Sequence, residues 1–228
     1  DYSQIELRII AAFSKDASMI EAFKNGIDIH TSTAAKVYGV PLELVTSEMR
    51  RNAKMVNFGI IYGISVFGLS QRLNIPRKEA AAIIENYFRE FPTIKSYMEN
   101  SIESARKNGY VETILGRRRY LRDINSANAV VRGFAERNAI NAPIQGSAAD
   151  LIKVAMINVH RVLHHELPHV KMILQVHDEL IFEVPDHALE ETKRLVKQEM
   201  EGVGKQLGLS VLLKVELGVG KNWRVAHP

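Results

Sequence analysis

Met172-Ile-Leu-Gln-Val-His-Asp-Glu-Leu-Ile-Phe-Glu-Val184 is the stretch of sequence that decides the fold. Two apolar runs of strand-forming residues flank a polar centre made of His177, Asp178 and Glu179. This pattern predicts a β-hairpin with a tight turn at the polar centre. Ionised carboxylates beside the core of a sheet are costly unless a metal or an opposite charge balances them. For this stretch by itself, a metal-binding turn and a solvated hairpin tip are both open interpretations.

A second acid lies at the start of the chain, in Asp1-Tyr-Ser-Gln-Ile-Glu-Leu-Arg8. By itself Asp1 is an ordinary end residue, but it stands on an extended piece that leads into an amphipathic helix. If Asp1 and Asp178 lie on adjacent strands of one sheet, their oxygens can bind two hard divalent cations. Two such ions, about 3.5–4 Å apart, stabilise the attacking and leaving oxygens of an in-line displacement.

Four side chains recur at a spacing of four residues: Arg50, Lys54, Phe58 and Tyr62. On a helix they share one face over roughly 18 Å. The cationic pair suits a triphosphate, and the two aromatic rings suit a sugar and a base. The residues between them are apolar side chains that can be buried and glycines that leave room for close approach: Ala53, Val56, Ile60, Gly59 and Gly63. An amphipathic helix with a solvated basic edge explains the same pattern.

The remaining patterns place helices between β-rich ends. The segment 31–109 is helical throughout, with Gly109 as a helix stop. The other expected elements are a hairpin at 111–121 around Gly116, a helix at 127–163 broken at Pro143, a helix capped by Asp186 that runs to 201, and a final strand at 211–217. We therefore expect a helical lobe standing on a mixed α/β lobe.

Composition sets limits on the class of protein. The chain has 228 residues, enough for one large domain or two intimate lobes, and its net charge of +4 is mild. It has no cysteine, which excludes disulfides, thiolate catalysis and cysteine-based metal sites. No apolar run approaches the ~20 residues of a membrane span, and no signal peptide precedes Asp1, which favours a soluble intracellular protein. Because the chain starts in mid-pattern, we expect it to be a piece of a longer one.

Three motifs carry a resemblance to the family A DNA polymerases, of the bacterial DNA polymerase I type. The stretch 1–8 resembles motif A, Arg50-Arg-Asn-Ala-Lys-Met-Val-Asn-Phe-Gly-Ile-Ile-Tyr-Gly63 resembles motif B, and Gln175-Val-His-Asp-Glu179 resembles motif C. Ala135-Glu-Arg-Asn-Ala-Ile-Asn-Ala-Pro-Ile-Gln-Gly-Ser-Ala-Ala-Asp150 is similar to the stretch of the family beside the primer–template. The likeness covers essentially the whole chain, in the same order and with similar spacing. Asn222-Trp223 also resembles the natural end of the family, although Lys221 and Arg224 depart from the expected acids.

The resemblance implies an α+β fold, the palm and fingers of a right-hand polymerase. The palm, an antiparallel sheet with packed helices, would comprise 1–30 and 115–228, with the motif C hairpin at about 172–184. Inserted α-helical fingers would comprise 31–114, with the motif B helix at about 47–63. The thumb is absent from this chain and would lie upstream, with the first palm strands and any exonuclease domain.

The resemblance also implies the catalytic groups. Asp1 and Asp178 would hold two Mg²⁺ ions, for which Mn²⁺ can substitute, with the Tyr2 carbonyl as a further ligand. Glu179 would be an auxiliary acid near the metals. Lys54 would grip the triphosphate and donate a proton to the leaving pyrophosphate.

The implied dNTP site comprises Tyr2, Gln4, Glu6, His30, Arg50, Lys54, Phe58 and Tyr62. Arg50 and His30 would contact phosphates, and Phe58 would pack on the sugar. Tyr62 would occupy the template-base position until the helix closes, and Glu6 would block a ribose 2′-hydroxyl. Without the motifs, His30 is equally a surface histidine before a cap at Thr31, and Glu6 a helix-surface acid.

The implied DNA contacts are Arg137, Asn141, Gln145 and His177, the last near the primer 3′ end. Polar groups of this kind suit the minor groove, whose acceptors are shared by all correct pairs. The densest basic run comprises Arg117, Arg118, Arg119 and Arg122, and either a phosphate contact or a solvated hairpin edge explains it.

The function implied is DNA-templated DNA synthesis from dNTPs on a primer–template, serving DNA replication and repair. The expected enzyme is a monomeric nucleotidyltransferase of the bacterial cytoplasm, associated with the nucleoid and not with membranes. A two-metal nuclease would have no use for the face from Arg50 to Tyr62, and a single-subunit RNA polymerase should not carry Glu6. A non-catalytic DNA-binding remnant need not retain Asp1, Asp178 and Lys54 together.

Overall fold

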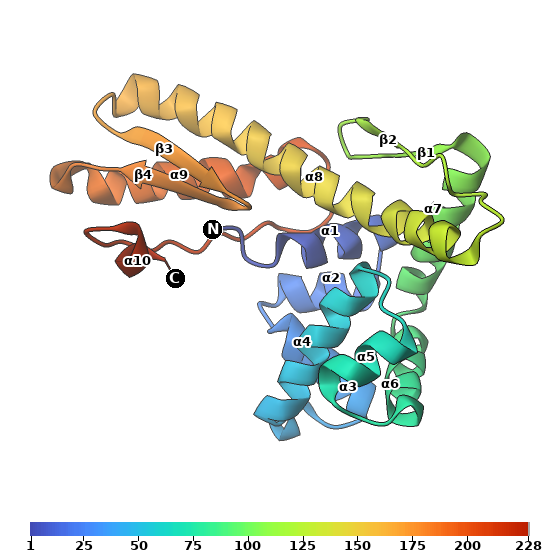
Figure 1. Ribbon diagram of the computed structural model, residues 1–228. Coiled ribbons are helices and arrows are strands. Elements are labelled where there is room, and N and C mark those ends of the chain that lie inside the picture. Colours follow the sequence, from blue (N-terminus) through green and yellow to red (C-terminus); the bar gives the residue numbers. More distant parts are fainter. Residues whose placement is uncertain (228) are drawn as a thin grey trace.

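A long helix, α8 (Ala129–Glu166), crosses the whole molecule in the computed structural model, which describes residues 1–227 (Figure 1). Its 38 residues span about 57 Å. Asn128 caps its start, because its side chain accepts hydrogen bonds from the amides of Val130 and Val131. The expected break at Pro143 is wrong, because α8 runs through it without interruption. Pro143 cannot donate to the preceding turn, but buried neighbours such as Ile140 and Ile144 hold both flanking turns in place.

The first half of the chain is helical, as the sequence predicts for 31–109. Its elements are α1 (Ile5–Ser14), α2 (Ala17–Lys24), α3 (Ile29–Tyr38), the short 3₁₀ helix η1 (Leu42–Leu44), α4 (Ser47–Ile61), α5 (Val66–Leu73), α6 (Arg77–Glu90) and α7 (Pro92–Asn108). Gly109 ends α7 with a φ of 77°, a left-handed conformation that glycine adopts freely, so the expected helix stop is confirmed.

Two separate antiparallel hairpins follow. The first pairs β1 (Tyr110–Glu112) with β2 (Arg118–Tyr120), and the second pairs β3 (Lys171–Val176) with β4 (Glu179–Glu183). In the second hairpin Val176 pairs with Glu179, so His177 and Asp178 form the tight turn that the sequence predicts. The chain ends with the 3₁₀ helix η2 (Asp186–Ala188), α9 (Leu189–Gln206) and α10 (Trp223–Ala226).

Two expectations for the C-terminal part are wrong. Asp186 begins the short turn η2 instead of capping α9, and α9 continues to Gln206. The segment 211–217 alternates between buried and exposed residues but forms no strand, and its one bridge joins Val215 to Tyr2. Alternation reports which side chains are buried, whereas a strand also requires a partner along its length.

Helix α1 lies at the centre of the fold and packs against α7, α8 and α4 (Figure 1). The helix is buried on more than the single face expected of an amphipathic helix, because Leu7 and Ala11 are as deeply buried as Ile9 and Ile10. In Figure 1 the helices α3–α6 project below α1, whereas β3, β4 and α9 lie beside α8 above it. No helix within residues 1–227 has the length and apolar character needed to span a membrane.

Candidate functional site

The backbone brings the two ends of the sequence together at the turn of the β3–β4 hairpin. The amide of Tyr2 donates to the carbonyl of Asp178 over 3.2 Å, and Tyr2 forms a bridge with Val215 on its other side. The carbonyl of Asp1 accepts from the amide of Glu216 at 2.9 Å. Asp1 and Asp178 are therefore neighbours across the chain, as expected, although a few backbone bonds replace a full strand pairing.

Tyr2 anchors this junction through its side chain. The ring is buried, and its hydroxyl donates to the carbonyl of Met200 on α9 over 2.7 Å. Burial raises the pKa of Tyr2 well above its usual value, and the charge of Glu201 raises it further. The phenol therefore stays neutral and acts as a fixed donor, which holds the backbone beside Asp1 in place.

One oxygen of the Asp1 carboxylate, Oδ1, has no hydrogen-bond partner among the described residues. It is the one enclosed side-chain oxygen or nitrogen, in the part of the chain that the structure describes, that makes no hydrogen bond. Residues 1–227 contain no cluster of three or more Asp, Glu, His or Cys side chains that could hold a metal. Mg²⁺ does not need such a cluster, because it takes one or two carboxylates together with substrate phosphates. The unpartnered oxygen beside Asp178 fits this mode of binding.

Glu179 is held away from bulk solvent by the C-terminal segment. Its Oε1 accepts a hydrogen bond from the indole nitrogen of Trp223 at 3.0 Å, and Nδ1 of His227 lies 3.4 Å from the same oxygen. A hollow of about 670 Å³ beside this contact is lined by Asp1, Phe182, Val219 and other residues of the same region. Trp223 thus contacts an acid of this site.

Arg50 is paired with an acid that sequence reasoning missed. Its Nε and one terminal nitrogen donate to the two oxygens of Asp28, at 3.0 and 2.8 Å. Asp28 also caps α3 by accepting from the amide of Thr31 at 2.7 Å. Burial by itself would raise the pKa of Asp28, but Arg50 and Thr31 outweigh it and lower the pKa to about 2. An aspartate three residues before a helical Thr was the available signal.

His30 is buried in the first turn of α3, so its interpretation as a surface histidine before a cap at Thr31 is wrong. Its ring centroid lies 5.9 Å from that of Phe58, and its Nδ1 lies 3.1 Å from Nδ2 of Asn57. Burial lowers the pKa of His30 to about 4, with Asp28 opposing and the cations of α4 adding to the effect. Lys54 is exposed one turn before Phe58 on α4, so the expected face of that helix is formed. Asn57 was not identified from the sequence.

Tyr62 links the end of α4 to α1. Its hydroxyl donates to Oε2 of Glu6 at 2.8 Å. Burial raises the pKa of Glu6, Tyr62 counteracts this, and the charge of Asp178 adds to it. Glu6 therefore lies close enough to the acidic pair to sense its charge.

Arg137 packs against the end of α4. A Cβ on Gly63, whose φ is +66°, would lie 2.7 Å from Cγ of Arg137. The room left by Gly63 is thus filled by a side chain of α8. Gln145 is exposed and Asn141 is partly buried, and both stand on the continuous α8, on either side of Pro143.

Two predicted site residues have an unusual backbone. His177 and Gln4 adopt left-handed conformations with φ of 51° and 56°. Each such residue costs about 1–2 kcal/mol unless it is glycine, so the surrounding structure must hold it. The carbonyl of His177 accepts from Nε2 of Gln175 at 3.1 Å, and Gln4 is the residue before α1.

Two arginines of the basic run, Arg117 and Arg118, are engaged within the protein. Arg117 pairs with Asp150, a buried acid of α8, and donates to the carbonyl of Gly146 at 3.1 Å. Arg118 pairs with Glu112 at 2.8 Å and covers the ring of Tyr110. These two arginines fasten the hairpin and its Tyr ring to the fold.

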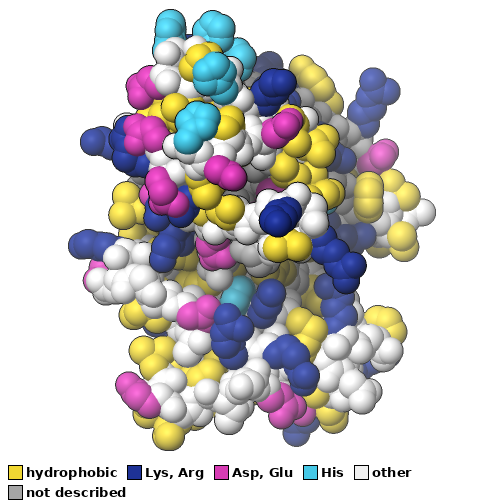
Figure 2. Space-filling view, turned by 90° about the vertical axis from the view of Figure 1, so that its left-hand side faces the viewer, with side chains coloured by type: hydrophobic (Ala, Val, Ile, Leu, Met, Phe, Trp, Pro, Cys, Tyr) yellow, Lys and Arg dark blue, Asp and Glu magenta, His cyan; other side chains and the backbone are white. Residues whose placement is uncertain are grey.

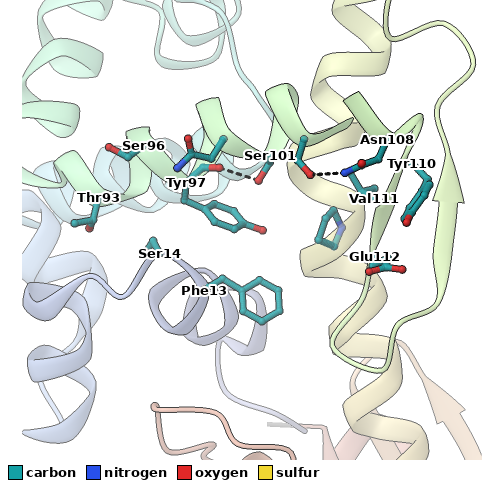
Figure 3. A pocket seen from close by; sticks show the side chains of 13 residues that line it. Phe13, Ser14, Thr93, Ser96, Tyr97, Ser101, Asn108, Tyr110, Val111 and Glu112 are labelled. Atoms are coloured by element: carbon teal, nitrogen blue, oxygen red, sulfur yellow. Dashed lines mark hydrogen bonds between the residues drawn. The ribbon is translucent and has the colours of Figure 1, made fainter. Parts of the chain in front are cut away.

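A second hollow lies away from these groups (Figure 3). It measures about 550 Å³ and lies between α1, α7 and β1, with Tyr97, Ser101 and Asn108 among the side chains that point toward it. Its lining contains none of the predicted site residues, and Glu112 is its one charged residue. The hydroxyl and amide groups of α7 make it polar but nearly neutral.

Charge is distributed unevenly on the face that carries the site. Figure 2 shows basic side chains gathered over its lower, helical part, below a hollow centre with acidic side chains. Arg50 and Lys54 are exposed on α4 in this lower part, whereas Asp1, Asp178 and Glu179 are only partly exposed. An acidic centre next to a basic helix suits a ligand with phosphates and bound cations.

The chain is similar to known polymerases over its whole length. A family model described as DNA polymerase family A matches residues 1–225. The chain is 55% identical to DNA polymerase I of Lactococcus lactis subsp. cremoris and 54% identical to DNA polymerase I of Geobacillus stearothermophilus. Each alignment covers 98% of this chain and 25% of the relative, so the chain spans about a quarter of the length of the curated relatives it matches.

A solved structure of the POL domain of Pol1 from M. smegmatis, in complex with DNA primer-template and dNTP, has the same fold. It matches with a TM-score of 0.95 and 46% identity, over 100% of this chain and 40% of that one. The mixed fold, the neighbouring aspartates and the match of residues 1–225 lead to one conclusion. The chain belongs to DNA polymerase family A.

Proposed function

We propose that this chain carries the nucleotidyl-transfer site of DNA-templated DNA synthesis. In this reaction a primer 3′-hydroxyl attacks the α-phosphate of a dNTP and pyrophosphate leaves. The observation that carries the proposal is the bond from the amide of Tyr2 to the carbonyl of Asp178, which brings Asp1 next to Asp178, with Oδ1 of Asp1 enclosed and unpartnered. Only a cation or a proton donor satisfies such an oxygen, and a triphosphate arrives with cations.

The proposed division of the chain follows the right-hand polymerases. Residues 1–30 and 115–228 would be palm, and 31–114 would be fingers, with α4 as the helix that receives the nucleotide. The thumb and any exonuclease domain would belong to the longer protein, of which relatives at 55% identity have about four times the length.

Asp1, Asp178 and the carbonyl of Tyr2 would hold two Mg²⁺ ions, for which Mn²⁺ can substitute. When bound, such ions supply a Lewis acid that stabilises the attacking and leaving oxygens. The residues themselves contribute position and charge. Tyr2 fixes the backbone, and Glu179 keeps an acid beside the pair through its bond to Trp223.

The face of α4 would bind the triphosphate. Arg50 uses two of its nitrogens on Asp28, which leaves its other terminal nitrogen free to donate to phosphate. Lys54 would contact the phosphates and donate a proton to the leaving pyrophosphate, while His30 would donate to a phosphate oxygen. Phe58 would pack on the sugar beside them.

Tyr62 and Glu6 would select the sugar. Their hydrogen bond of 2.8 Å forms a wall between α4 and α1. A ribose adds a hydroxyl that must clash with this wall or break its bond. Gln4 precedes α1 next to Glu6, so the same turn would help to shape the nucleotide site.

The DNA contacts would come from α8 and the hairpin turn. Arg137, Asn141 and Gln145 would reach minor-groove acceptors that all correct pairs share, and His177 would lie near the primer 3′ end. The M. smegmatis relative was solved with a primer-template and a dNTP, and we propose the same partners here. We further propose a monomer in the bacterial cytoplasm, associated with the nucleoid.

Primer extension by the full-length protein tests this function against its rivals. A labelled primer–template is incubated with dNTPs, with rNTPs, or without nucleotide. We expect extension with dNTPs only. Shortening of the primer alone indicates a nuclease, extension with rNTPs indicates an RNA polymerase, and binding without reaction indicates a DNA-binding remnant.

A further inference from the structure

A buried polar trio joins α3 to α4 beside the proposed phosphate site. Asn57 and Thr33 are fully buried and His30 is 2% exposed. Nδ2 of Asn57 lies 3.1 Å from Nδ1 of His30, and Oγ1 of Thr33 lies 3.1 Å from the amide of Asn57. Because all three side chains are buried, their polar groups must find partners within the protein, and these contacts supply them.

The contact with Asn57 decides which nitrogen of His30 carries a proton. An amide nitrogen donates and cannot accept, so Nδ1 of His30 must be the acceptor. Burial lowers the pKa of His30 to about 4, and Arg50 and Lys54 act in the same direction against Asp28. The ring is therefore neutral near pH 7 and has one proton, which lies on Nε2.

Nε2 is free to meet a ligand. This nitrogen makes no hydrogen bond within residues 1–227. Among the side-chain nitrogens and oxygens described there, Oδ1 of Asp1 is the one that is both enclosed and without a partner, so Nε2 must be open to solvent. The charges nearest the ring are those of Asp28, Arg50 and Lys54. A neutral N–H next to two cations is a donor for an anion.

The reverse arrangement would not serve an anionic ligand. If Oδ1 of Asn57 faced His30, the proton would move to Nδ1, and Nε2 would present a lone pair. A lone pair repels a phosphate oxygen, whereas an N–H bonds to it. The identity of the amide atom that faces Nδ1 therefore determines whether His30 attracts or repels phosphate.

We propose that Asn57 is a positioning residue that holds His30 in the Nε2–H tautomer and so presents this N–H to the phosphates of the nucleotide. The inference rests on the proposed function only for the identity of the ligand. Asn57 does not touch the nucleotide itself. The state of the ring precedes ligand binding and can be measured in the free protein.

The test is nuclear magnetic resonance of the full-length protein with ¹⁵N-labelled histidine. Two-bond ¹H–¹⁵N correlations distinguish the two neutral tautomers, and His30→Gln assigns the signal. We expect Nε2–H in the native protein. Asn57→Leu, which removes the donor at similar volume, should give a mixture of both tautomers, whereas Thr33→Val should leave Nε2–H unchanged.

Kinetics with these variants and with Asn57→Asp supply a second measurement. In Asn57→Asp, whose carboxylate should move the proton to Nδ1, loss of one charge-assisted bond to phosphate should raise the KM for a dNTP about tenfold, with a smaller change in kcat. In Asn57→Leu, where both tautomers coexist, the KM should rise only about twofold, in proportion to the lost Nε2–H fraction. Thr33→Val should leave the KM unchanged, since the contact to Nδ1 persists. If Asn57→Leu does not fold, the tautomer of the native protein still decides, as does Asn57→Asp.

Two results would overturn the inference: an Nδ1–H tautomer in the native protein, or pure Nε2–H in Asn57→Leu. Failure of the proposed function looks different. In that case the tautomer would be Nε2–H, but dATP added with a dideoxy-terminated primer–template would leave the His30 signals in place.

Discussion

The hydroxyl of Tyr62 donates to Oε2 of Glu6 over 2.8 Å, which ties the end of α4 to the first turn of α1. The two residues are 56 positions apart in the sequence. Burial raises the pKa of Glu6, and the charge of Asp178 raises it further, so the Tyr62 bond offsets part of the cost of an ionised acid. This relationship underlies the first prediction.

Replacing Glu6 by Ala should admit ribonucleotides. Without Glu6 there is space beside C2′, and a ribose hydroxyl breaks no hydrogen bond. In the native protein, breaking the Glu6–Tyr62 bond would cost ribose about 1–3 kcal/mol. We expect the rNTP/dNTP ratio of insertion efficiency to rise at least about tenfold. Single-nucleotide insertion kinetics with a matched pair of nucleotides measure it, and Glu85→Ala, at an exposed site on α6, is the control. An unchanged ratio would make Glu6 an ordinary helix-surface acid.

Replacing Asp1 or Asp178 by Asn should remove synthesis without removing DNA binding. An amide keeps the shape but loses the charge that attracts cations, so turnover should fall by more than about a hundredfold. Extension rate and fluorescence anisotropy of labelled DNA measure the two effects separately. Asp186 lines the same hollow as Asp1, and Asp186→Asn is the control that should behave as the native protein. Near-normal turnover in either active-site variant would contradict the two-metal proposal.

Phe58→Tyr should increase the use of dideoxynucleotides. In the proposed site this ring would pack on the sugar, where a new hydroxyl could replace the missing 3′ partner. One hydrogen bond of about 1 kcal/mol corresponds to roughly five- to tenfold in insertion efficiency. Competition between a ddNTP and its dNTP measures the change, with Phe67→Tyr on α5 as the control. Equal ddNTP use by all three proteins would place Phe58 away from the sugar.

The ion pair of Asp28 should stabilise the fold in a way that depends on pH. Its pKa is lowered from 3.8 to about 2, so its contribution is complete above pH 4 and is lost as the pH falls through about 2. Because the carboxylate is 36% exposed, we expect only about 1 kcal/mol. Asp28→Asn keeps the helix cap but weakens the pair with Arg50. Urea unfolding should show a deficit at pH 7 that shrinks toward pH 2, and a deficit independent of pH would exclude the ion pair as its cause.

Gly63→Ala should be worse than other glycine substitutions in similar backbone. Its added Cβ would come within 2.7 Å of Arg137, besides the strain of a φ of +66°. Gly39 has a φ of +67° and nothing within 4 Å, so Gly39→Ala isolates the backbone cost of about 1 kcal/mol. The difference in free energy of unfolding between the two variants, together with DNA affinity, measures the contact with Arg137. Equal losses would show that Arg137 moves aside freely.

The sequence predicts the elements whose cause is local. The turn at His177 and Asp178, the helical run to Gly109 and the shared face of α4 follow from periodicity and turn chemistry. The errors arise where tertiary contacts decide. Pro143 stays inside α8 because packing outweighs the lost bond, and 211–217 is not a strand because only Tyr2 bridges it.

The motifs indicate the candidate site, but they do not indicate the residues that support it. Asp28, Asn57 and Trp223 contact Arg50, His30 and Glu179, and each contact joins positions at least 22 residues apart. No spacing rule for a single helix or strand can indicate such pairs.

The hydrogen bond from the backbone nitrogen of Asp1 to the carbonyl of Glu216 joins positions 215 residues apart, which bears on the order of folding. On the ribosome, Asp1 emerges long before Val215 and Glu216 exist. Helices α1–α7 make mostly neighbouring contacts and can form early. The segment at Tyr2, however, lacks its bridge until nearly the whole chain has been synthesised. A nascent chain stalled before residue 211 can therefore contain folded helices and the bond of Tyr2 to Asp178, but the backbone beside Asp1 lacks its second partner until Val215 and Glu216 emerge.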